Sequence, residues 1–309
     1  MELLQKNYVT VFIASRNRPD FSLMALNSAI NQTYKRKKII FSDNSTNLDT
    51  RFRIEEHFLK DRNLFSYKKR DNLTSTEHFQ ILLKEVDTEF VVFFHDDDIL
   101  DPEYLNTAFE IFAEHNDVSA IGFNAKLINE KNEFLRNLNS KYFMKDIKIF
   151  KKNQYYNYFY NRTLIKPSPF PSYIYKTKFL KNPMGQNKHD DVNFVAQCLD
   201  GGNIFWSKEI KISYRIHKTQ DSFSESLIQR IEQFRNMQLD SSLAVNEKKH
   251  FKAHIRFTYW KNHFSRKNRD FFKKRYNKAR NFIIFEVLKI LLFKPRFLLF
   301  KIFTFFVKY

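Results

Sequence analysis

The chain has 309 residues, enough for one large domain or two modest ones with a sizeable buried core. Its formal net charge is +19, but residues 246–309 hold 18 basic side chains against three acidic ones, a net charge of +15. The first 245 residues therefore carry only about +4, so a near-neutral body precedes a basic tail. Such a tail favours a long anionic partner, either membrane headgroups or nucleic acid.

Glycine and cysteine are scarce, which excludes several classes of site. The four glycines satisfy neither G-x-G-x-x-G nor G-x-x-x-x-G-K, so both glycine-rich phosphate-binding loops are absent. The single cysteine, Cys198, excludes an intrachain disulfide and a cysteine-cluster site for zinc or iron–sulfur, and it fits a reducing compartment. No cationic segment precedes an apolar one at the N-terminus, so we expect no signal peptide.

The first hundred residues alternate apolar, strand-like runs with helical patterns. The predicted strands are residues 9–15, 38–42, 64–69 and 90–94. The predicted helices are residues 21–31, 51–59 and 74–86, the last opened by the capping box Thr74-Ser-Thr-Glu77. This alternation predicts a parallel sheet covered on both faces, whose ligands bind beyond the carboxyl ends of the strands. Polar clusters follow the first, second and fourth strands.

The remaining chain changes composition sharply near residue 225. Residues 102–115 predict a helix and residues 210–214 a strand, within a region of short strands and aromatic-rich loops. From about residue 227 the pattern is helical to the end, with Lys and Arg interleaved among Phe, Tyr and Trp. We therefore expect a folded domain over residues 1–225 and a helical region over residues 226–309.

Three adjacent carboxylates, Asp96, Asp97 and Asp98, follow the predicted strand 90–94 with no basic residue beside them in the sequence. They raise one another's pKa unless a cation lies among them. A hard divalent ion, Mg²⁺ or Mn²⁺, prefers such oxygens together with substrate phosphates. The alternative is a solvated acidic loop that caps the next helix, for which Pro102 suits the first turn.

Two further polar clusters lie later in the chain. His189-Asp190-Asp191 precedes a helical pattern that ends at Gly201-Gly202. Its carboxylates either favour the helix N-terminus or supply a general base beside an acceptor hydroxyl. Tyr214-Arg-Ile-His217 follows the strand predicted over 210–214, and a lone Arg-x-His pair is more often structural than catalytic.

The order and setting of these clusters resemble the inverting glycosyltransferases of family 2, which have the GT-A fold. The resembling segments, within residues 8–222, are VTVFIASRNRPDFSLMALNSAINQTY, IIFSDNST, FVVFFHDDDILDPEYL, HDDVNF and YRIHKTQDS. The resemblance implies a Rossmann-like α/β fold with a mixed, mostly parallel sheet flanked by helices, and here a C-terminal α-helical extension. It assigns nucleotide-sugar binding to residues 1–98 and acceptor binding to residues 99–225. The most similar members are bacterial sugar transferases of capsule or lipopolysaccharide synthesis.

The resemblance also implies roles for individual residues. The nucleotide-sugar-binding set is Ser15, Arg16, Arg18, Asp43, Asp71, Asn72, Asp96 and Arg215, in which Asp43 would contact the base. The metal-binding set is Asp97, Asp98 and His217, with Asp97 as the direct ligand in a D-x-D-type motif. Asp191 would be the general base and Asp190 its acidic neighbour.

Three positions depart from the family's pattern. Arg16 stands where an aromatic residue commonly packs on the base, although an arginine could stack there too. His95 occupies the first position of D-x-D-D, so a ligand pair confined to the outer positions is not expected. The segment that begins at Asn72 lacks the usual glycine, which alters the ribose and diphosphate contacts predicted near Asp71 and Asn72.

The basic tail contains no run of the roughly 20 apolar residues needed to span a bilayer. On a helix, Lys294, Lys301 and Lys308 would form one narrow stripe beside a wide apolar face, which favours a position in the headgroup plane. Residues 266–280 add a cationic patch suited to anionic lipids. The alternative is packing on the catalytic domain or, in a homo-oligomer, on a second copy. Nucleic acid is not expected as a partner, because no recognised binding module is present.

The sequence therefore predicts a metal-dependent glycosyltransferase that moves a sugar from a nucleotide diphosphate sugar, preferentially a UDP-sugar, to a glycan or lipid-linked acceptor. The expected cofactor is Mn²⁺ or Mg²⁺. The expected location is cytoplasmic, on the inner face of a bacterial plasma membrane, in surface polysaccharide synthesis. One alternative is a GT-A protein that only binds a nucleotide sugar or a glycan. Another is a scaffold that binds lipid or nucleic acid through its basic tail.

Overall fold

The computed structural model of the chain describes residues 7–58, 62–139, 145–161, 166–181 and 190–217. His189 and the tail over 226–309 lie outside the described residues, together with the predictions made for them. The chain divides into two compact units, residues 1–155 with 166–224 and residues 156–165 with 225–309. All of the described strands belong to the first unit. Within the described residues, no helix combines the length and apolar composition needed to cross a membrane.

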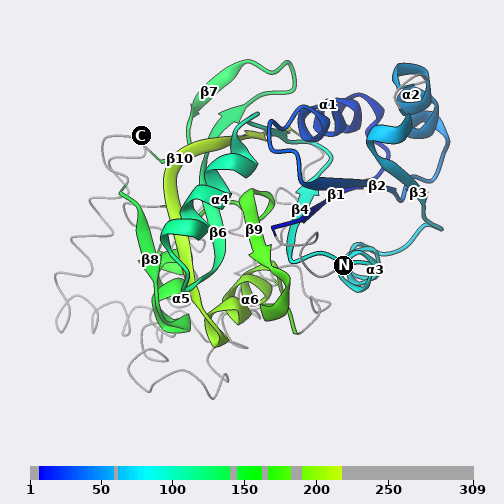
Figure 1. Ribbon diagram of the computed structural model, residues 1–309. Helices are drawn as coiled ribbons and strands as arrows, with labels where there is room; N and C mark the ends of the chain where they lie inside the picture. Colours follow the sequence, from blue (N-terminus) through cyan, green and yellow to red (C-terminus); the bar gives the residue numbers. More distant parts are fainter. Residues whose placement is uncertain (1–6, 59–61, 140–144, 162–165, 182–189, 218–309) are drawn as a thin grey trace, which may run out of the picture. The chain divides into compact units, whose positions relative to one another are not determined.

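The first half of the sheet is parallel. Its strands are β1 (Val9–Ser15), β2 (Lys37–Asp43), β3 (Ser66–Lys69) and β4 (Phe90–His95), in the spatial order β3-β2-β1-β4. The connecting helices are α1 (Pro19–Ile30), α2 (Asp49–His57) and α3 (Ser75–Lys84). Figure 1 shows α1 and α2 on one face of this half and α3 on the other. Both faces are therefore covered, as the continuous apolar strands predict.

The second half of the sheet is mixed. The order continues from β4 through β9 (Tyr173–Lys176), β6 (Val118–Ile128) and β10 (Asn203–Arg215) to β5 (Ile99–Leu100). β10 lies parallel to β6, whereas β9 runs antiparallel to both of its neighbours. The remaining strands are β7 (Phe134–Asn137), on β6, and β8 (Ile147–Ile149), on β10. The remaining helices are α4 (Tyr104–Glu114), α5 (Lys152–Asn161) and α6 (Asp190–Ala196).

The aromatic composition is used to fill the two faces of the central strands. Val11 of β1 joins a core cluster with Leu26 of α1 and Phe94 of β4, and all three are fully buried. The next residue along β1, Phe12, stacks on Phe93 of β4 with ring centroids 5.9 Å apart, and Phe93 in turn contacts Phe79 of α3. The two-residue period of the strands thus sends Val11 to one face and Phe12 to the other, and aromatic rings contribute to the packing on both faces.

The predicted α/β class and mostly parallel sheet are confirmed. The capping box at Thr74 is confirmed as well: the Thr74 hydroxyl accepts from the Glu77 amide, and the Glu77 carboxylate accepts from the Thr74 amide. Most of the predicted elements agree with the structure to within two residues at each end, and two differ more from their predicted extents. The strand predicted over 210–214 is only the last part of β10. The prediction began too late because exposed Lys208 and Glu209 interrupt the apolar pattern of β10 at a register shift. The helix predicted after Asp191 remains α-helical only to Ala196 and then becomes the 3-10 turn η5 (Gln197–Asp200).

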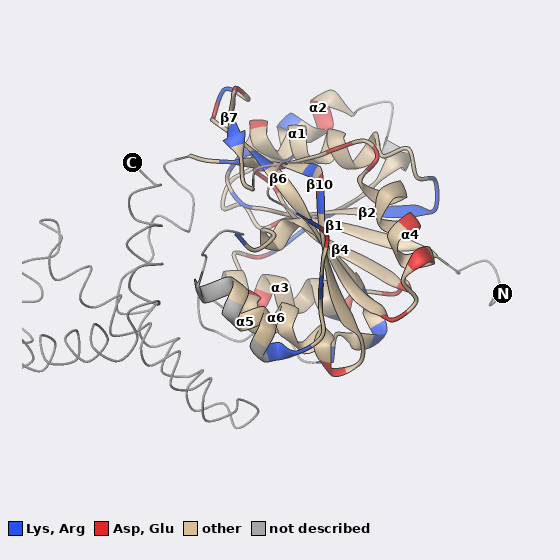
Figure 2. Ribbon diagram, turned by 90° about the vertical axis from the view of Figure 1, so that its left-hand side faces the viewer, with Lys and Arg blue, Asp and Glu red and all other residues tan. Residues whose placement is uncertain are grey.

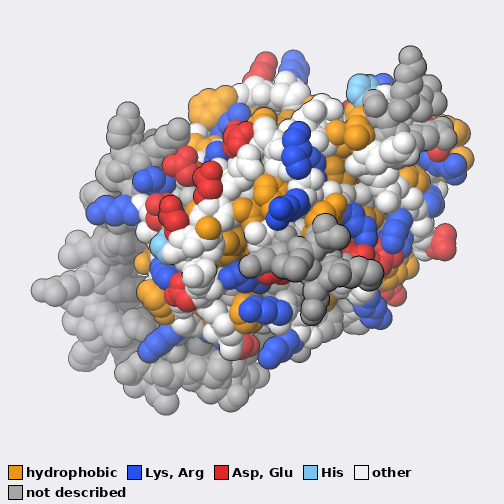
Figure 3. Space-filling model, in the orientation of Figure 1, with side chains coloured by type: hydrophobic (Ala, Val, Ile, Leu, Met, Phe, Trp, Pro, Cys, Tyr) orange, Lys and Arg blue, Asp and Glu red, His pale blue; other side chains and the backbone are white. Residues whose placement is uncertain are grey.

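The described surface is mixed in charge. On the face drawn in Figure 3, acidic and basic side chains are interspersed among polar ones. Figure 2 gives the same impression from the side, with blue and red segments scattered over strands, helices and loops. This distribution agrees with the small net charge of the first 245 residues, about +4.

Candidate functional site

The pairing of the strands brings several polar clusters to one edge of the sheet. Ser15, the last residue of β1, pairs with Asp43, the last residue of β2. On the other side of β1, Ala14 pairs with His95, the last residue of β4. β5 then pairs with the end of β10, where Ile99 lies opposite Ser213. The residues that follow β4 and β10 therefore meet at the carboxyl edge predicted to bind ligands.

Asp96 is held by groups from the loop between β1 and α1. It is 2% exposed, and its Oδ1 accepts from Arg18 Nη1 at 2.8 Å while its Oδ2 accepts from the Arg16 amide at 2.9 Å. Burial raises the pKa of Asp96, and the Arg18 guanidinium opposes that rise. Both oxygens of Asp96 are thus already engaged by donors of the protein.

Asp97 lies between two cationic or potentially cationic groups. Its Oδ2 accepts from Arg18 Nη1 at 3.1 Å and lies 2.8 Å from Nε2 of His217, an imidazole that is 4% exposed. Burial alone would raise the pKa of Asp97, but His95, the hydrogen bond from His217 and the charge of Arg18 together hold it below its usual range. Asp97 is therefore ionised at neutral pH, and it is the one carboxyl group of the three whose pKa is lowered.

Asp98 has one oxygen without a partner among the described residues. Its Oδ1 accepts from the Arg215 amide at 2.9 Å, whereas its Oδ2 is buried and has no hydrogen-bond partner in the described part of the chain. Burial and the neighbouring Asp97 raise the pKa of Asp98 well above its usual range. An unmet carboxylate oxygen in a buried position is costly unless another group satisfies it.

A divalent cation fits this arrangement. His95, Asp97 and Asp98 each offer one ligand atom, and these atoms all lie within 4.8 Å of one another. An ion among them would satisfy the free oxygen of Asp98 and would reduce the repulsion between the two carboxylates. The sequence interpretation did not include His95 among the ligands, although its place in the D-x-D-D position was the signal that could have found it.

Arg215 holds the carboxylate loop in place through its side chain. It is fully buried, and its Nε donates to the Asp97 carbonyl at 2.8 Å while Nη1 donates to the Asn129 carbonyl at 2.9 Å. Its guanidinium also lies over the ring of Phe21, 4.5 Å from the centroid. In this structure the side chain predicted to bind the donor contacts the protein itself, and it joins β10 to the loop after β4.

Asp43 is also turned into the protein. It is fully buried, its Oδ1 accepts from the Ser45 amide at 2.8 Å, and its Oδ2 accepts from the Tyr67 hydroxyl at 2.5 Å. Lys69 Nζ lies 3.8 Å from the same Oδ2. Burial and the bond to Asp43 raise the pKa of Tyr67, so this hydroxyl stays protonated and donates.

The other residues predicted to bind the donor lie near Asp43 and Asp96. Ser15 Oγ shares a 2.6 Å hydrogen bond with Ser22 of α1. Arg16 reaches across to the loop after β3, where it donates to Asn72 Oδ1 and to the Leu73 carbonyl, both at 2.7 Å. Asn72 has φ of 48°, a left-handed conformation that asparagine tolerates, and the neighbouring Asp71 is exposed. Arg16 therefore ties two loops together at this edge of the sheet.

Asp190 and Asp191 form the first turn of α6. Asp190 is 9% exposed, and Asp191 Oδ1 accepts from the Val192 amide at 2.9 Å. Further along the helix, Phe194 packs edge-on against Phe79 and Phe93, with centroids 4.9 and 5.9 Å apart. The aromatic layer beneath β4 thus anchors the helix that carries the predicted base.

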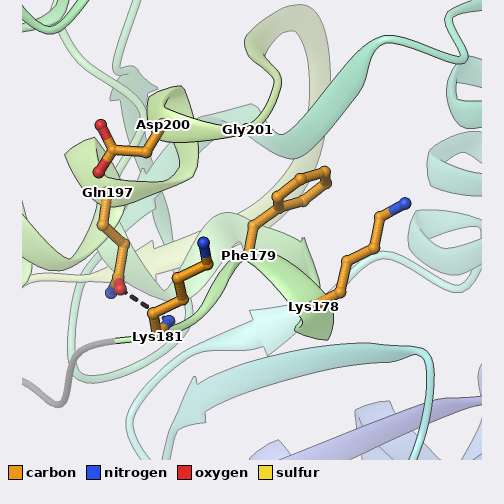
Figure 4. A pocket seen from close by; sticks show the side chains of 6 residues that line it. All are labelled: Lys178, Phe179, Lys181, Gln197, Asp200 and Gly201. Carbon is orange, nitrogen blue, oxygen red and sulfur yellow. Dashed lines mark hydrogen bonds between the residues drawn. The ribbon is translucent and has the colours of Figure 1, made fainter.

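A separate pocket of about 190 Å³ is formed by the segment after β9 and by η5 with the residue that follows it. It is lined by Lys178, Phe179, Lys181, Gln197, Asp200 and Gly201 (Figure 4). β9 pairs Lys176 with Phe90, the first residue of β4, so the segment after β9 lies near the amino end of β4. The pocket is therefore on the opposite edge from the carboxylates and contains none of the predicted site residues.

Comparisons with known proteins agree with this architecture. The family model for glycosyl transferase family 2 matches residues 10–174, more than half of the chain. No curated protein sequence matches this chain. The structure is similar to the S. aureus TarS 1-349 fragment in complex with UDP-GlcNAc, with 18% identity, a TM-score of 0.61, and coverage of 90% of this chain and 79% of that one.

A second similar structure is the mannosyltransferase PcManGT from Pyrobaculum calidifontis in complex with GDP-Man and Mn²⁺. It has 12% identity and a TM-score of 0.60, and the match covers 96% of this chain and 82% of that one. At these identities the two likenesses establish the fold, and the family model establishes the family. The chain belongs to glycosyl transferase family 2.

Proposed function

We propose that this glycosyltransferase moves a sugar from a nucleotide diphosphate sugar to a hydroxyl of a glycan or lipid-linked acceptor, with inversion at the anomeric carbon. The main support is the buried cluster of Asp96, Asp97 and Asp98 at the carboxyl edge of β4 in a family 2 chain. The similar structures were solved with UDP-GlcNAc and with GDP-Man, which supports a nucleotide sugar as donor. A UDP-sugar is the donor we favour.

A divalent cation, Mn²⁺ or Mg²⁺, is part of the proposal, and Asp97 with Asp98 would hold it. When bound, such an ion stabilises the negative charge that develops on the leaving diphosphate. The protein supports this role by keeping Asp97 ionised and by fixing its Oδ2 with His217 at 2.8 Å. The sequence predicts His217 as a metal ligand. Because Nε2 of His217 contacts Asp97, we propose instead that His217 orients the carboxylate of Asp97 toward the cation.

The proton transfer is assigned to Asp191. The acceptor oxygen attacks the anomeric carbon from the face opposite the nucleotide, the bond from that carbon to the diphosphate oxygen breaks, and the acceptor proton passes to the Asp191 carboxylate. Asp190, beside it in the first turn of α6, is the acidic neighbour. The contacts of Phe194 with the aromatic layer would hold both residues on a rigid element.

The test is a donor screen followed by a transfer assay on the full chain. Thermal shifts with UDP- and GDP-sugars, with and without Mn²⁺, identify the donor, and release of the nucleoside diphosphate in the presence of candidate acceptors measures transfer. We expect Asp191→Asn to bind the donor as the wild type does and to lose transfer by on the order of 10²–10⁴-fold. Equal turnover in the variant would overturn the assignment of the base. Donor binding without hydrolysis or transfer in the wild type would instead favour a protein that only binds nucleotide sugars.

The setting of the reaction is also a proposal. A tail with a net charge of +15 and many phenylalanines supports a place on the anionic inner face of a bacterial plasma membrane, where capsule or lipopolysaccharide is assembled. Full-length protein should sediment with vesicles that contain anionic lipid and much less with zwitterionic ones. Changing Lys294, Lys301 and Lys308 to Glu should weaken that binding; equal sedimentation would favour packing of the tail on protein.

A further inference from the structure

His95 is a half-buried imidazole at the end of β4 that the proposed chemistry does not use. Its ring packs near Phe170, with centroids 5.9 Å apart, and Ala14 of β1 lies opposite it in the sheet. Among the described residues, His95, Asp97 and Asp98 form the one group in which three potential ligand atoms come together, within 4.8 Å. The position of His95 is therefore set by a central strand and not by a loose loop.

The neighbouring contacts show which carboxylate oxygens of the cluster are already engaged. Both oxygens of Asp96 accept hydrogen bonds, from Arg18 at 2.8 Å and from the Arg16 amide at 2.9 Å. The same Arg18 nitrogen lies 3.1 Å from Asp97 Oδ2, so the space between Asp96 and Asp97 already holds a positive charge. A second cation between these two carboxylates would have to displace Arg18.

Asp98, by contrast, has an oxygen that no group of the described residues satisfies. Asp98 is 1% exposed, and its Oδ2 is buried without a hydrogen-bond partner among the described residues. Because Asp98 Oδ2 is buried, it needs a donor or a cation. The Arg215 amide does not meet this need, since it is bound to Oδ1. His95 adds a ring nitrogen within 4.8 Å of the ligand atoms of Asp97 and Asp98. The available ligand atoms are then one imidazole nitrogen and two carboxylate oxygens.

We propose that His95 is a direct ligand of the divalent cation, which lies among His95, Asp97 and Asp98, and that the site therefore selects a transition metal such as Mn²⁺ over Mg²⁺. An imidazole nitrogen suits transition metals, whereas Mg²⁺ strongly prefers oxygen ligands. This inference deepens the proposed function, because it rests on a cation at this edge of the sheet and specifies its ligand and its class.

The experiment measures the metal itself, on full-length protein without donor. Mn²⁺ is titrated while free Mn²⁺ is followed by electron paramagnetic resonance, and Mg²⁺ is then added as a competitor. Bound Mn²⁺ is also examined by electron spin echo envelope modulation, in which a directly bound imidazole gives a ¹⁴N signal. Wild-type protein should give this signal and should bind Mn²⁺ at least about 10-fold more tightly than Mg²⁺.

Three variants separate the possible sources of the signal. His95→Asp, which supplies only oxygen, should lose the ¹⁴N signal, keep cation binding and narrow the preference for Mn²⁺. His217→Gln should keep the signal, because Nε2 of His217 contacts Asp97. His57→Gln, at the exposed end of α2, is the control for loss of an imidazole elsewhere. Circular dichroism of each variant verifies folding.

The outcomes distinguish the inference from the function on which it rests. Bound Mn²⁺ without a ¹⁴N signal, or an unchanged metal preference in His95→Asp, would overturn the role of His95 and leave the glycosyltransferase proposal intact. Failure of the wild type to bind any divalent cation, with transfer persisting in EDTA, would overturn both the metal site and the metal dependence of the proposed function.

Discussion

Carboxylates lie at the carboxyl ends of the two parallel strands that flank β1, and their surroundings differ. At the end of β2, Asp43 has donors on both oxygens, from Ser45 and Tyr67. After β4, Asp98 keeps one buried oxygen without a partner among the described residues. The two strand ends thus differ in how far the protein itself satisfies their carboxylates. Among the described residues, the unpartnered oxygen of Asp98 is the one with capacity for a further donor or cation.

The largest effect in this comparison is expected for Asp97→Asn, in the carboxylate cluster that follows β4. The change removes the ionised carboxylate between Arg18 and His217 with little change in volume. We expect transfer to fall by on the order of 10²–10³-fold, because charge stabilisation of the leaving group is lost. Steady-state release of nucleoside diphosphate measures the loss, and thermal unfolding of the same preparation verifies the fold. Activity within threefold of the wild type would place the essential charge elsewhere.

Arg215→Met tests whether the loop after β4 depends on the buried guanidinium. The substitution keeps an apolar stem but leaves the carbonyls of Asp97 and Asn129 without their donors. We expect the free energy of unfolding to fall by about 3 kcal/mol, measured by denaturant titration. Arg215→Lys is the matched variant, since it keeps the charge but cannot make both bonds, and it should recover only part of the loss. A stable Arg215→Met protein with weakened donor binding would instead assign this side chain to the donor.

Asp43→Asn is the counterpart of Asp97→Asn on the other strand. Its amide can still accept from Ser45, but it loses the charge that faces Tyr67 and Lys69. We expect the free energy of unfolding to fall by about 1–2 kcal/mol while the KM for the donor changes less than threefold. A large rise in KM with unchanged stability would show that Asp43 turns outward to the base when the donor binds. Tyr67→Phe provides the control for loss of the hydroxyl alone.

The last prediction concerns acid stability near Asp43, where the effect per pH unit is small. Burial, followed by the charge of Arg70, lowers the pKa of His78 to about 4, and its Nε2 lies 2.7 Å from Ser42 Oγ. Because unfolded histidine titrates near 6.5, the unfolded chain binds more protons between pH 6.5 and pH 4. Stability contributed by neutral His78 is therefore present above pH 6.5 and is lost as the pH falls through this range, by about 1 kcal/mol per pH unit.

His78→Gln removes the titrating group and keeps an acceptor for Ser42. Its free energy of unfolding, measured by urea titration between pH 7 and pH 4.5, should depend less on pH than that of the wild type. Equal slopes in the two proteins would show that His78 does not contribute to the acid response. His115→Gln is a suitable control, because this histidine stacks on Phe205 of β10 instead.

The local parts of the fold could be predicted from the sequence. Each of these parts depends on residues that are neighbours along the chain, so its pattern can be read from the sequence. Examples are the apolar runs of β1 and β4 and the capping box at Thr74. β9 could not be placed in this way. It follows β6 and α5 in the chain but lies antiparallel between β4 and β6, and such an insertion depends on distant hydrogen-bonding partners. The length of β10 was hidden by its exposed bulge at Lys208.

The sequence by itself determined the partition of charge, the alternation of strands and helices, and the presence of carboxylates at the ends of β2 and β4, because each follows from composition or from periodicity along the chain. Only the tertiary structure decided which oxygens of each carboxylate have hydrogen-bond partners. Arg18 reaches Asp96 across 78 residues, and His217 reaches Asp97 across 120. Whether an oxygen is satisfied depends on such distant donors, which strand register brings together and which no local pattern specifies.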